Sequence, residues 1–121
     1  ITYCAAGLSD SAGESRFDTT GDTGGAVNPE GNTELVLKTI DEITKGTATF
    51  IKLDIEGYEE KALLGASETI RNKKPQIAVS AYHKCGDLWK LYTIVNDIRD
   101  DYRIYLRHYT PGAFDTVLYF V

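Results

Sequence analysis

The chain has 121 residues, of which 42% are hydrophobic and 26% are charged, and its formal net charge is −5. This length and composition are typical of one folded domain and argue against a disordered chain or a coiled coil. The negative charge argues against a nucleic-acid partner, and no stretch is long and apolar enough to span a membrane. No signal peptide opens the chain, so we expect a cytoplasmic protein whose two cysteines, Cys4 and Cys85, are reduced and partly buried.

The first forty residues predict short strands around a polar loop. Residues 1–6 are typical of a short strand, and residues 14–18 are typical of its hairpin partner beyond a turn at 9–13. Residues 19–32 are rich in glycine, threonine, aspartate and asparagine, and they predict a surface loop. The glycines of this loop do not lead from a strand into a helix, so we expect no phosphate binding there. Residues 33–40 predict the next strand.

From residue 49 onward, the sequence predicts alternating strands and helices. Apolar runs predict the strands, and apolar stripes at helical spacing predict the helices. The strands are expected at 49–55, 76–82, 102–108 and 116–121, and the helices at 58–73, ended by Pro75, and at 87–99, with Asp87 as N-cap. Right-handed crossovers make the first three strands parallel, and the short last connection makes the final strand antiparallel. The sequence therefore predicts an α/β layered sheet.

This sheet is expected to be incomplete. Strand 49–55 is too apolar for a sheet edge and has the character of a central strand. The chain also begins at Ile1 and contains no methionine. We therefore expect residues 1–121 to be a fragment that is marginally stable or oligomeric by itself, because a missing neighbour leaves an unpaired strand edge.

Charged side chains follow the carboxyl ends of the parallel strands, the edge at which open α/β sheets bind ligands. Asp54 ends an apolar strand, Glu56 follows it, and Gly57 allows the backbone to turn sharply. His83 lies just past the next strand. We interpret Asp54, Glu56 and His83 as the candidate catalytic residues. Structural alternatives remain, such as an ion pair between Asp54 and Lys52.

Other polar and aromatic residues near this edge are expected to be structural. Glu59 and Glu60 suit the positive end of the helix that follows. Arg107 and His108 point to opposite sides of their strand, so at most one of them faces the cleft. Trp89 is expected to anchor its helix to the sheet.

The same candidate residues include acceptable ligands for a divalent cation, namely Asp54, Glu56 and His83. The sequence has no His-x-x-x-His motif and no cysteine pair with the spacing of a metal site. It therefore predicts no metal site.

Several passages resemble the FkbM family of S-adenosylmethionine-dependent methyltransferases. The central one is FIKLDIEGYEEKALLGA, which is similar to the family's strand-to-helix motif around Asp-x-Glu-Gly-x-Glu. The others are AAGLSDSAGESRF, TIDEI, PQIAVSAYHKCGDLWKL and YRIYLRHYTPGAFDTVLYFV. The sequence departs from the family at Ile40, where the family has leucine, and at Asp115, where glutamate is frequent. Together the passages cover nearly the whole chain in the family's order.

The resemblance implies a class I methyltransferase fold, a Rossmann-like sheet whose last strand is antiparallel. Residues 1–121 would be the C-terminal part of one such domain, and the first strands, with the glycine-rich cofactor loop, would lie upstream. The implied cofactor is S-adenosylmethionine. Ala6, Gly7 and Leu8 would lie near its adenine, and Asp54 near its reactive end.

The resemblance also implies the reaction. Glu56 and His83 would line the acceptor side, and a hydroxyl of a sugar, glycan or polyketide-like acceptor would attack the sulfonium methyl in line. Either His83 or Asp54 would remove the hydroxyl proton. By itself the fragment is expected to be inactive.

Two alternative functions remain open at this point. One is a non-enzymatic module that forms homo-oligomers through its exposed strand edges. The other is a hydrolase that uses Asp54 and Glu56, which on a continuing strand would point to the same side about 7 Å apart.

Overall fold

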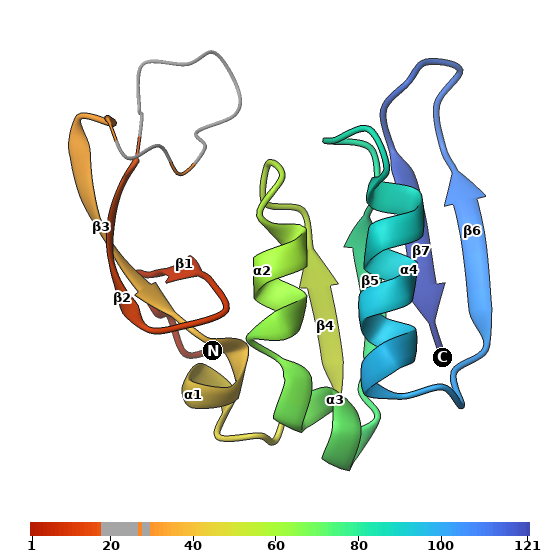
Figure 1. The fold of residues 1–121 in the computed structure, drawn as a ribbon, viewed down its shortest axis with the longest axis horizontal. Coiled ribbons are helices and arrows are strands. Elements are labelled where there is room, and N and C mark those ends of the chain that lie inside the picture. Colours follow the sequence, from red (N-terminus) through yellow and green to blue (C-terminus); the bar gives the residue numbers. More distant parts are fainter. Residues whose placement is uncertain (18–26, 28–29) are drawn as a thin grey trace.

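A computed structural model describes residues 1–17, 27 and 30–121, and it shows a mixed α/β fold with two sheets (Figure 1). The smaller sheet has the strand order β1-β3-β2, and the larger sheet has the order β4-β5-β7-β6. The strands are β1 (Gly7–Leu8), β2 (Gly13–Phe17), β3 (Thr33–Lys38), β4 (Phe50–Leu53), β5 (Gln76–Ser80), β6 (Ile104–His108) and β7 (Thr116–Phe120). The helices are α1 (Ile40–Thr44), α2 (Glu59–Leu64), α3 (Ser67–Lys73) and α4 (Asp87–Ile98).

The smaller sheet corrects the prediction for the start of the chain. Both of its outer strands pair with β3: β1 runs parallel to it and β2 antiparallel. The predicted strand at 1–6 is therefore wrong, as is its hairpin with 14–18, because residues 1–5 are exposed and only Gly7 and Leu8 meet β3. Most of the predicted loop at 19–32 lies outside the described residues, although Val27 forms a bridge with Phe17.

The larger sheet has the predicted strand directions. β4 and β5 are parallel, and β7 is antiparallel to both of its neighbours, β5 and β6. β6 therefore runs in the same direction as β4 and β5. β5 is the one partner of β4 among the residues that the structure describes, and Phe50 is 58% exposed. β4 therefore has the unpaired edge expected of an incomplete sheet.

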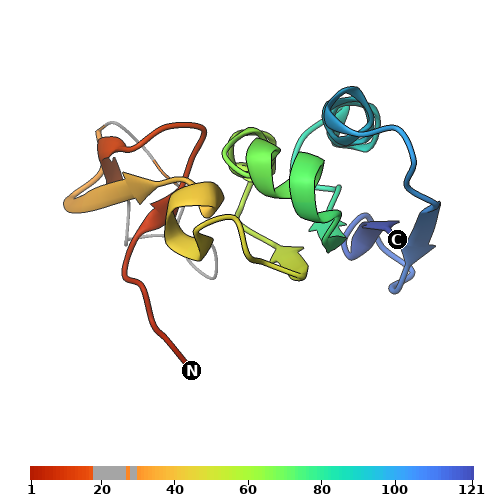
Figure 2. The same ribbon diagram turned by 90° about the horizontal axis from the view of Figure 1, so that it is seen from below.

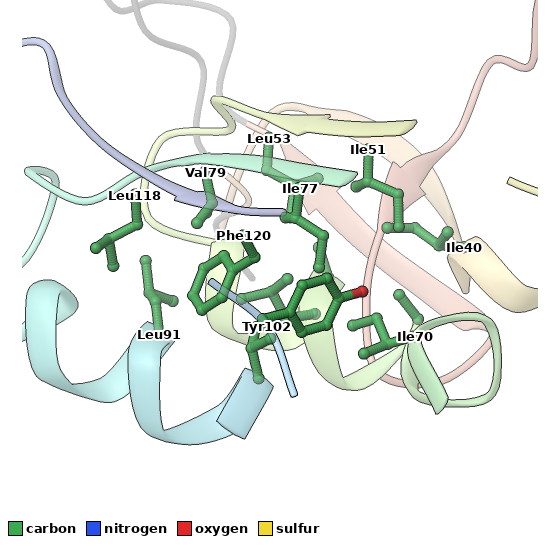
Figure 3. Packing of buried hydrophobic residues seen from close by; sticks show 14 of the residues in the cluster. Ile40, Ile51, Leu53, Ile70, Ile77, Val79, Leu91, Tyr102, Leu118 and Phe120 are labelled. Atoms are coloured by element: carbon green, nitrogen blue, oxygen red, sulfur yellow. The ribbon is translucent and has the colours of Figure 1, made fainter. Parts of the chain in front are cut away.

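The core lies between the larger sheet and three helices, α2, α3 and α4, which all cover the same face (Figure 2). Alternate residues of the strands point toward these helices, and Phe120 and Tyr102 stack edge to face in the middle of the cluster (Figure 3). β5 is buried on both faces, as predicted, although the helices cover only one of them. On the other face its small residue Ala78 lies between the larger side chains of Lys52 and Tyr119 on the neighbouring strands.

The predicted helix at 58–73 is two helices, and a distant carboxylate explains the break. The Asp41 side chain accepts hydrogen bonds from the backbone nitrogens of Glu68 (3.0 Å) and Thr69 (2.8 Å) and from the Thr69 hydroxyl (2.6 Å), so it caps the start of α3. The backbone nitrogen of Asp41 also donates to the carbonyl of Gly65 (3.0 Å). A side chain at Gly65 would overlap the carbonyl of Ser9. This junction joins α1 and the turn after β1 to the helices of the larger sheet.

Further details also differ from the predictions. α4 has Gly86 as its N-cap, and Asp87 is its first residue, whose carboxylate accepts from the nitrogen of Lys84 (2.7 Å). Cys4 and Cys85 are free, but both are exposed and not partly buried. Among the described residues, no helix has the length and apolar character needed to cross a lipid bilayer.

Candidate functional site

The turn after β4 carries the first two candidate residues in a constrained backbone. β4 ends at Leu53, and the chain then turns so sharply that Glu56 has φ = 53° and Gly57 has φ = 91°. A left-handed backbone is unfavourable for a residue with a side chain and is frequent at functional sites. Since the strand does not continue to Glu56, the geometry on which the hydrolase alternative rested is not present.

The structure brings the three predicted catalytic residues together around the ring of His83. Atom Nε2 of His83 lies 3.6 Å from Oδ1 of Asp54 and 3.6 Å from Oε2 of Glu56. The His83 side chain is only 9% exposed. Neither of its ring nitrogens has a hydrogen bond of good geometry in the part of the chain that the structure describes. A buried polar group without a partner is rare in proteins and calls for an explanation.

Sequence reasoning missed a fourth member of this cluster, Glu59. The sequence predicts for it only a structural role at the positive end of α2, but Glu59 is 1% exposed and contacts His83. Its Oε1 accepts from the backbone nitrogen of Ile55 (2.8 Å) and lies 2.9 Å from Nδ1 of His83, whereas Asp54 and Glu56 lie near Nε2. The helical spacing of Glu59 to Ala62 and Leu63, both fully buried, was the signal that placed it on the core side of α2.

Asp54 is a carboxylate held in contact with several polar groups. Its Oδ1 accepts from the hydroxyl of Tyr82 (3.3 Å), and its Oδ2 lies 3.4 Å from Nζ of Lys52, the ion pair foreseen as a structural alternative. Burial acts to raise the pKa of Asp54, but the hydrogen bond with Ser80 and the charge of Lys52 lower it, and the net pKa is below the ordinary value. Burial and the charge of Asp54 raise the pKa of Tyr82. Near neutral pH, Asp54 is therefore negative and Tyr82 is neutral.

A pocket of about 420 Å³ connects the predicted cofactor residues to this cluster. Its volume lies in the range of small-molecule sites. The pocket has an apolar part beside the smaller sheet and an acidic part at the turn after β4. Its lining residues are Ala6, Gly7, Leu8, Phe17, Val27, Leu35, Asp54, Ile55, Glu56 and Tyr58. A second hollow of about 480 Å³ lies over β2 and β3 and contains none of the candidate residues.

Other residues near the predicted edge do not join the cluster. His108 is exposed, and its Nδ1 lies 2.9 Å from the hydroxyl of Thr116. Arg107 is exposed as well and donates to the carbonyl of Leu106 (2.8 Å). The prediction for Trp89 is wrong, because this side chain is 72% exposed and lies outside the buried stripe of α4.

The cluster also contains a set of possible metal ligands. Asp54, Glu59 and His83 each offer a ligand atom, and these atoms lie within 4.8 Å of one another. No sequence spacing reveals this set because its members come from three separate elements: the end of β4, the start of α2 and the loop after β5.

Comparison with known proteins identifies the family. The family model of the methyltransferase FkbM domain matches residues 2–110. The chain is similar over its full length to the crystal structure of methyltransferase FkbM from Methylobacillus flagellatus KT, with 38% sequence identity and a TM-score of 0.81. It spans 28% of the length of that protein. No curated protein matches the chain. With a family match over nearly the whole sequence and a full-length structural likeness, this chain belongs to the FkbM methyltransferase family.

Proposed function

We propose that this chain is the C-terminal part of an S-adenosylmethionine-dependent methyltransferase that methylates a hydroxyl group on a sugar, glycan or polyketide-like acceptor. The single observation that carries the proposal is the pocket in which Ala6, Gly7 and Leu8 meet Asp54 and Glu56. Family membership supports methyl transfer as the reaction. The order β4-β5-β7-β6, with β7 antiparallel, supports the later half of a class I, Rossmann-like sheet.

The residues of the pocket suit the proposed cofactor. S-adenosylmethionine has an apolar aromatic base and a positively charged sulfonium, and when bound it supplies the methyl group. The apolar residues around Ala6, Gly7 and Leu8 suit the base. The carboxylate of Asp54, with its lowered pKa, suits the positive charge.

The residues around His83 suit the acceptor. Methyl transfer to a hydroxyl requires alignment of that hydroxyl and removal of its proton. We assign both tasks to the pair of Asp54 and His83, whose Oδ1 and Nε2 atoms are 3.6 Å apart. Glu56 lies at the same distance from Nε2 and completes the acceptor side.

A pair of ligands that differ in one charge tests the cofactor site. S-adenosylmethionine carries a sulfonium, whereas S-adenosylhomocysteine has a neutral sulfur. Calorimetric titrations should show that Asp54→Asn weakens binding of S-adenosylmethionine by about three- to tenfold more than binding of S-adenosylhomocysteine, because one charge interaction is lost. Asp97→Asn, an exposed substitution on α4, is the control and should change neither affinity.

The titrations should be carried out on this chain and on a form extended upstream, where we propose that the glycine-rich loop lies. Binding to the extended form alone supports both the cofactor and the inactivity of the fragment. Binding to neither form, or an equal loss for the two ligands in Asp54→Asn, contradicts the proposal.

The free edge of β4 favours a second candidate function, assembly through strand pairing. An unpaired edge presents backbone donors and acceptors to another chain, and Phe50 adds an exposed apolar side chain. Two copies paired along β4 should sediment as a dimer, and Phe50→Lys should shift the equilibrium toward monomer. A compact monomer at high concentration contradicts this second function.

A further inference from the structure

The His83 side chain has one nitrogen whose environment the proposed reaction does not fully explain. Atom Nε2 is buried and has no hydrogen-bond partner among the described residues, yet it points between two carboxylates, at 3.6 Å from Asp54 Oδ1 and 3.6 Å from Glu56 Oε2. Both distances are too long for a hydrogen bond. A nitrogen in this position is available to bind something that lies between the three side chains.

The charge around the ring favours a cation in this position. The carboxylates of Asp54, Glu56 and Glu59 all lie near one imidazole. The positive charges of Lys52 and Lys84 do not neutralise these carboxylates at Nε2. Lys52 contacts the other oxygen of Asp54, and Nζ of Lys84 donates to the carbonyl of Gly57.

The distances also suit a shared ion. Two ligand atoms bound to one ion at about 2.1 Å lie roughly 3.0–3.5 Å apart for octahedral or tetrahedral angles. The observed separations of 3.6 Å from Nε2 to each carboxylate are close to this range. Glu56 is held at this position by a left-handed backbone, which is a cost that a binding role would explain.

Glu59 adds a third carboxylate to the same cluster. Its Oε1 lies 2.9 Å from Nδ1 of His83, yet the described residues give Nδ1 no hydrogen bond of good geometry. The ligand atoms of Glu59, Asp54 and His83 lie within 4.8 Å of one another, so Glu59 can bind the same ion.

We propose that His83 and the carboxylates of Asp54, Glu56 and Glu59 bind one divalent cation that accepts mixed nitrogen and oxygen ligands, such as Mn²⁺ or Zn²⁺. Imidazole and carboxylate are both ordinary ligands for these ions. The role of the cation rests on the proposed function and changes one of its steps: a divalent ion lowers the pKa of a hydroxyl bound to it. The proton of that hydroxyl would then pass to water, because a His83 nitrogen bound to the cation cannot accept it. The binding itself does not depend on methyl transfer.

The two histidines of the chain allow a direct test. Mn²⁺ is paramagnetic and broadens NMR signals of nearby nuclei, so a titration of this chain with Mn²⁺ should broaden the ring signals of His83 first. His108 is the internal control because it is exposed on β6, does not belong to the cluster and contacts Thr116. Calorimetry with Mn²⁺ and with Zn²⁺ should give one ion per chain.

Matched variants separate this site from general attraction to acidic residues. Glu56→Gln and Glu60→Gln each remove one negative charge close in the sequence, but Glu60 does not contact His83. We expect Glu56→Gln to weaken Mn²⁺ binding at least tenfold and Glu60→Gln to change it less than twofold. Glu56 is 43% exposed, so its substitution should not prevent folding. His83→Gln should abolish binding, with its circular dichroism spectrum as the check on folding.

Equal broadening of His83 and His108, or equal effects of Glu56→Gln and Glu60→Gln, would overturn the cation site. Failure here is distinguishable from failure of the proposed function. Binding of S-adenosylhomocysteine in the presence of EDTA, without any Mn²⁺ site, would leave methyl transfer standing and remove the cation. Specific Mn²⁺ binding to a protein whose extended form does not bind S-adenosylhomocysteine would support the cation site and contradict the proposed methyl transfer.

Discussion

Replacing Asp41 by alanine should destabilise the chain far more than its position in a short helix would indicate. The carboxylate of Asp41 caps α3 through the backbone nitrogens of Glu68 and Thr69 and also accepts from the Thr69 hydroxyl. Loss of an N-cap costs about 1 kcal/mol. Thr69 is fully buried, so its donors would lose their acceptor without access to water, which adds about 1–2 kcal/mol. We therefore expect the free energy of unfolding to fall by roughly 2–3 kcal/mol.

Urea denaturation followed by circular dichroism measures this loss, and thermal unfolding should show a melting temperature lower by roughly 8–12 °C, at about 4 °C per kcal/mol. Asp41→Asn retains an acceptor and should lose less than about 1 kcal/mol. Glu42→Ala is the matched control, because this neighbouring acid forms only the exposed capping box of α1 with Thr39. If Asp41→Ala costs no more than Glu42→Ala, the explanation of the helix break by a distant cap is wrong.

Two further predictions concern the core. The hydroxyl of Tyr102 donates to the carbonyl of Pro75 (2.8 Å), and burial raises the pKa of Tyr102 from 10.0 to about 12. Because the folded state prefers the neutral phenol, this stabilisation is complete below pH 10 and is lost as the pH rises through 12, by up to about 3 kcal/mol. Tyr102→Phe should lack this alkaline loss in urea titrations, and an identical loss in the variant would contradict the assignment. In α4, Leu91→Ala should cost about 2–5 kcal/mol because Leu91 is fully buried, whereas Trp89→Ala should stay within about 0.5 kcal/mol because Trp89 is 72% exposed. A large loss in Trp89→Ala would restore the anchor role that the sequence predicted.

Much of the larger sheet could be predicted because its signals are local. The apolar run of β5 and the stripe of α4 occur within single elements, and right-handed crossovers then determine the strand directions. The break between α2 and α3 could not be predicted in this way. It depends on Asp41, which is 27 residues distant from Glu68 in the sequence, and the apolar stripe continues across the break as if one helix were present.

The candidate site likewise contains residues that the sequence predicts and one that only the tertiary structure reveals. Asp54, Glu56 and His83 were found because the ends of parallel strands meet at one edge, a rule that needs only the strand order. Glu59 was missed because an acid in the first turn of a helix usually faces water, and only tertiary packing shows that this one faces His83. The sequence of β6 does not reveal that the whole strand is exposed, because this exposure depends on its place at the edge of the larger sheet.

The turn at Glu56 and Gly57 limits which substitutions this chain can accept. Both residues have positive φ angles, so β-branched or bulky substitutions there would change the backbone path as well as the side chain. Such a substitution would also displace the carboxylates of Asp54 and Glu56. None of residues 109–114 has a positive φ angle, and Phe114, which is 67% exposed, meets Tyr82 edge to face at 6.0 Å between ring centroids. Libraries that test the proposed acceptor side should therefore vary residues 109–114 and keep the turn after β4 unchanged.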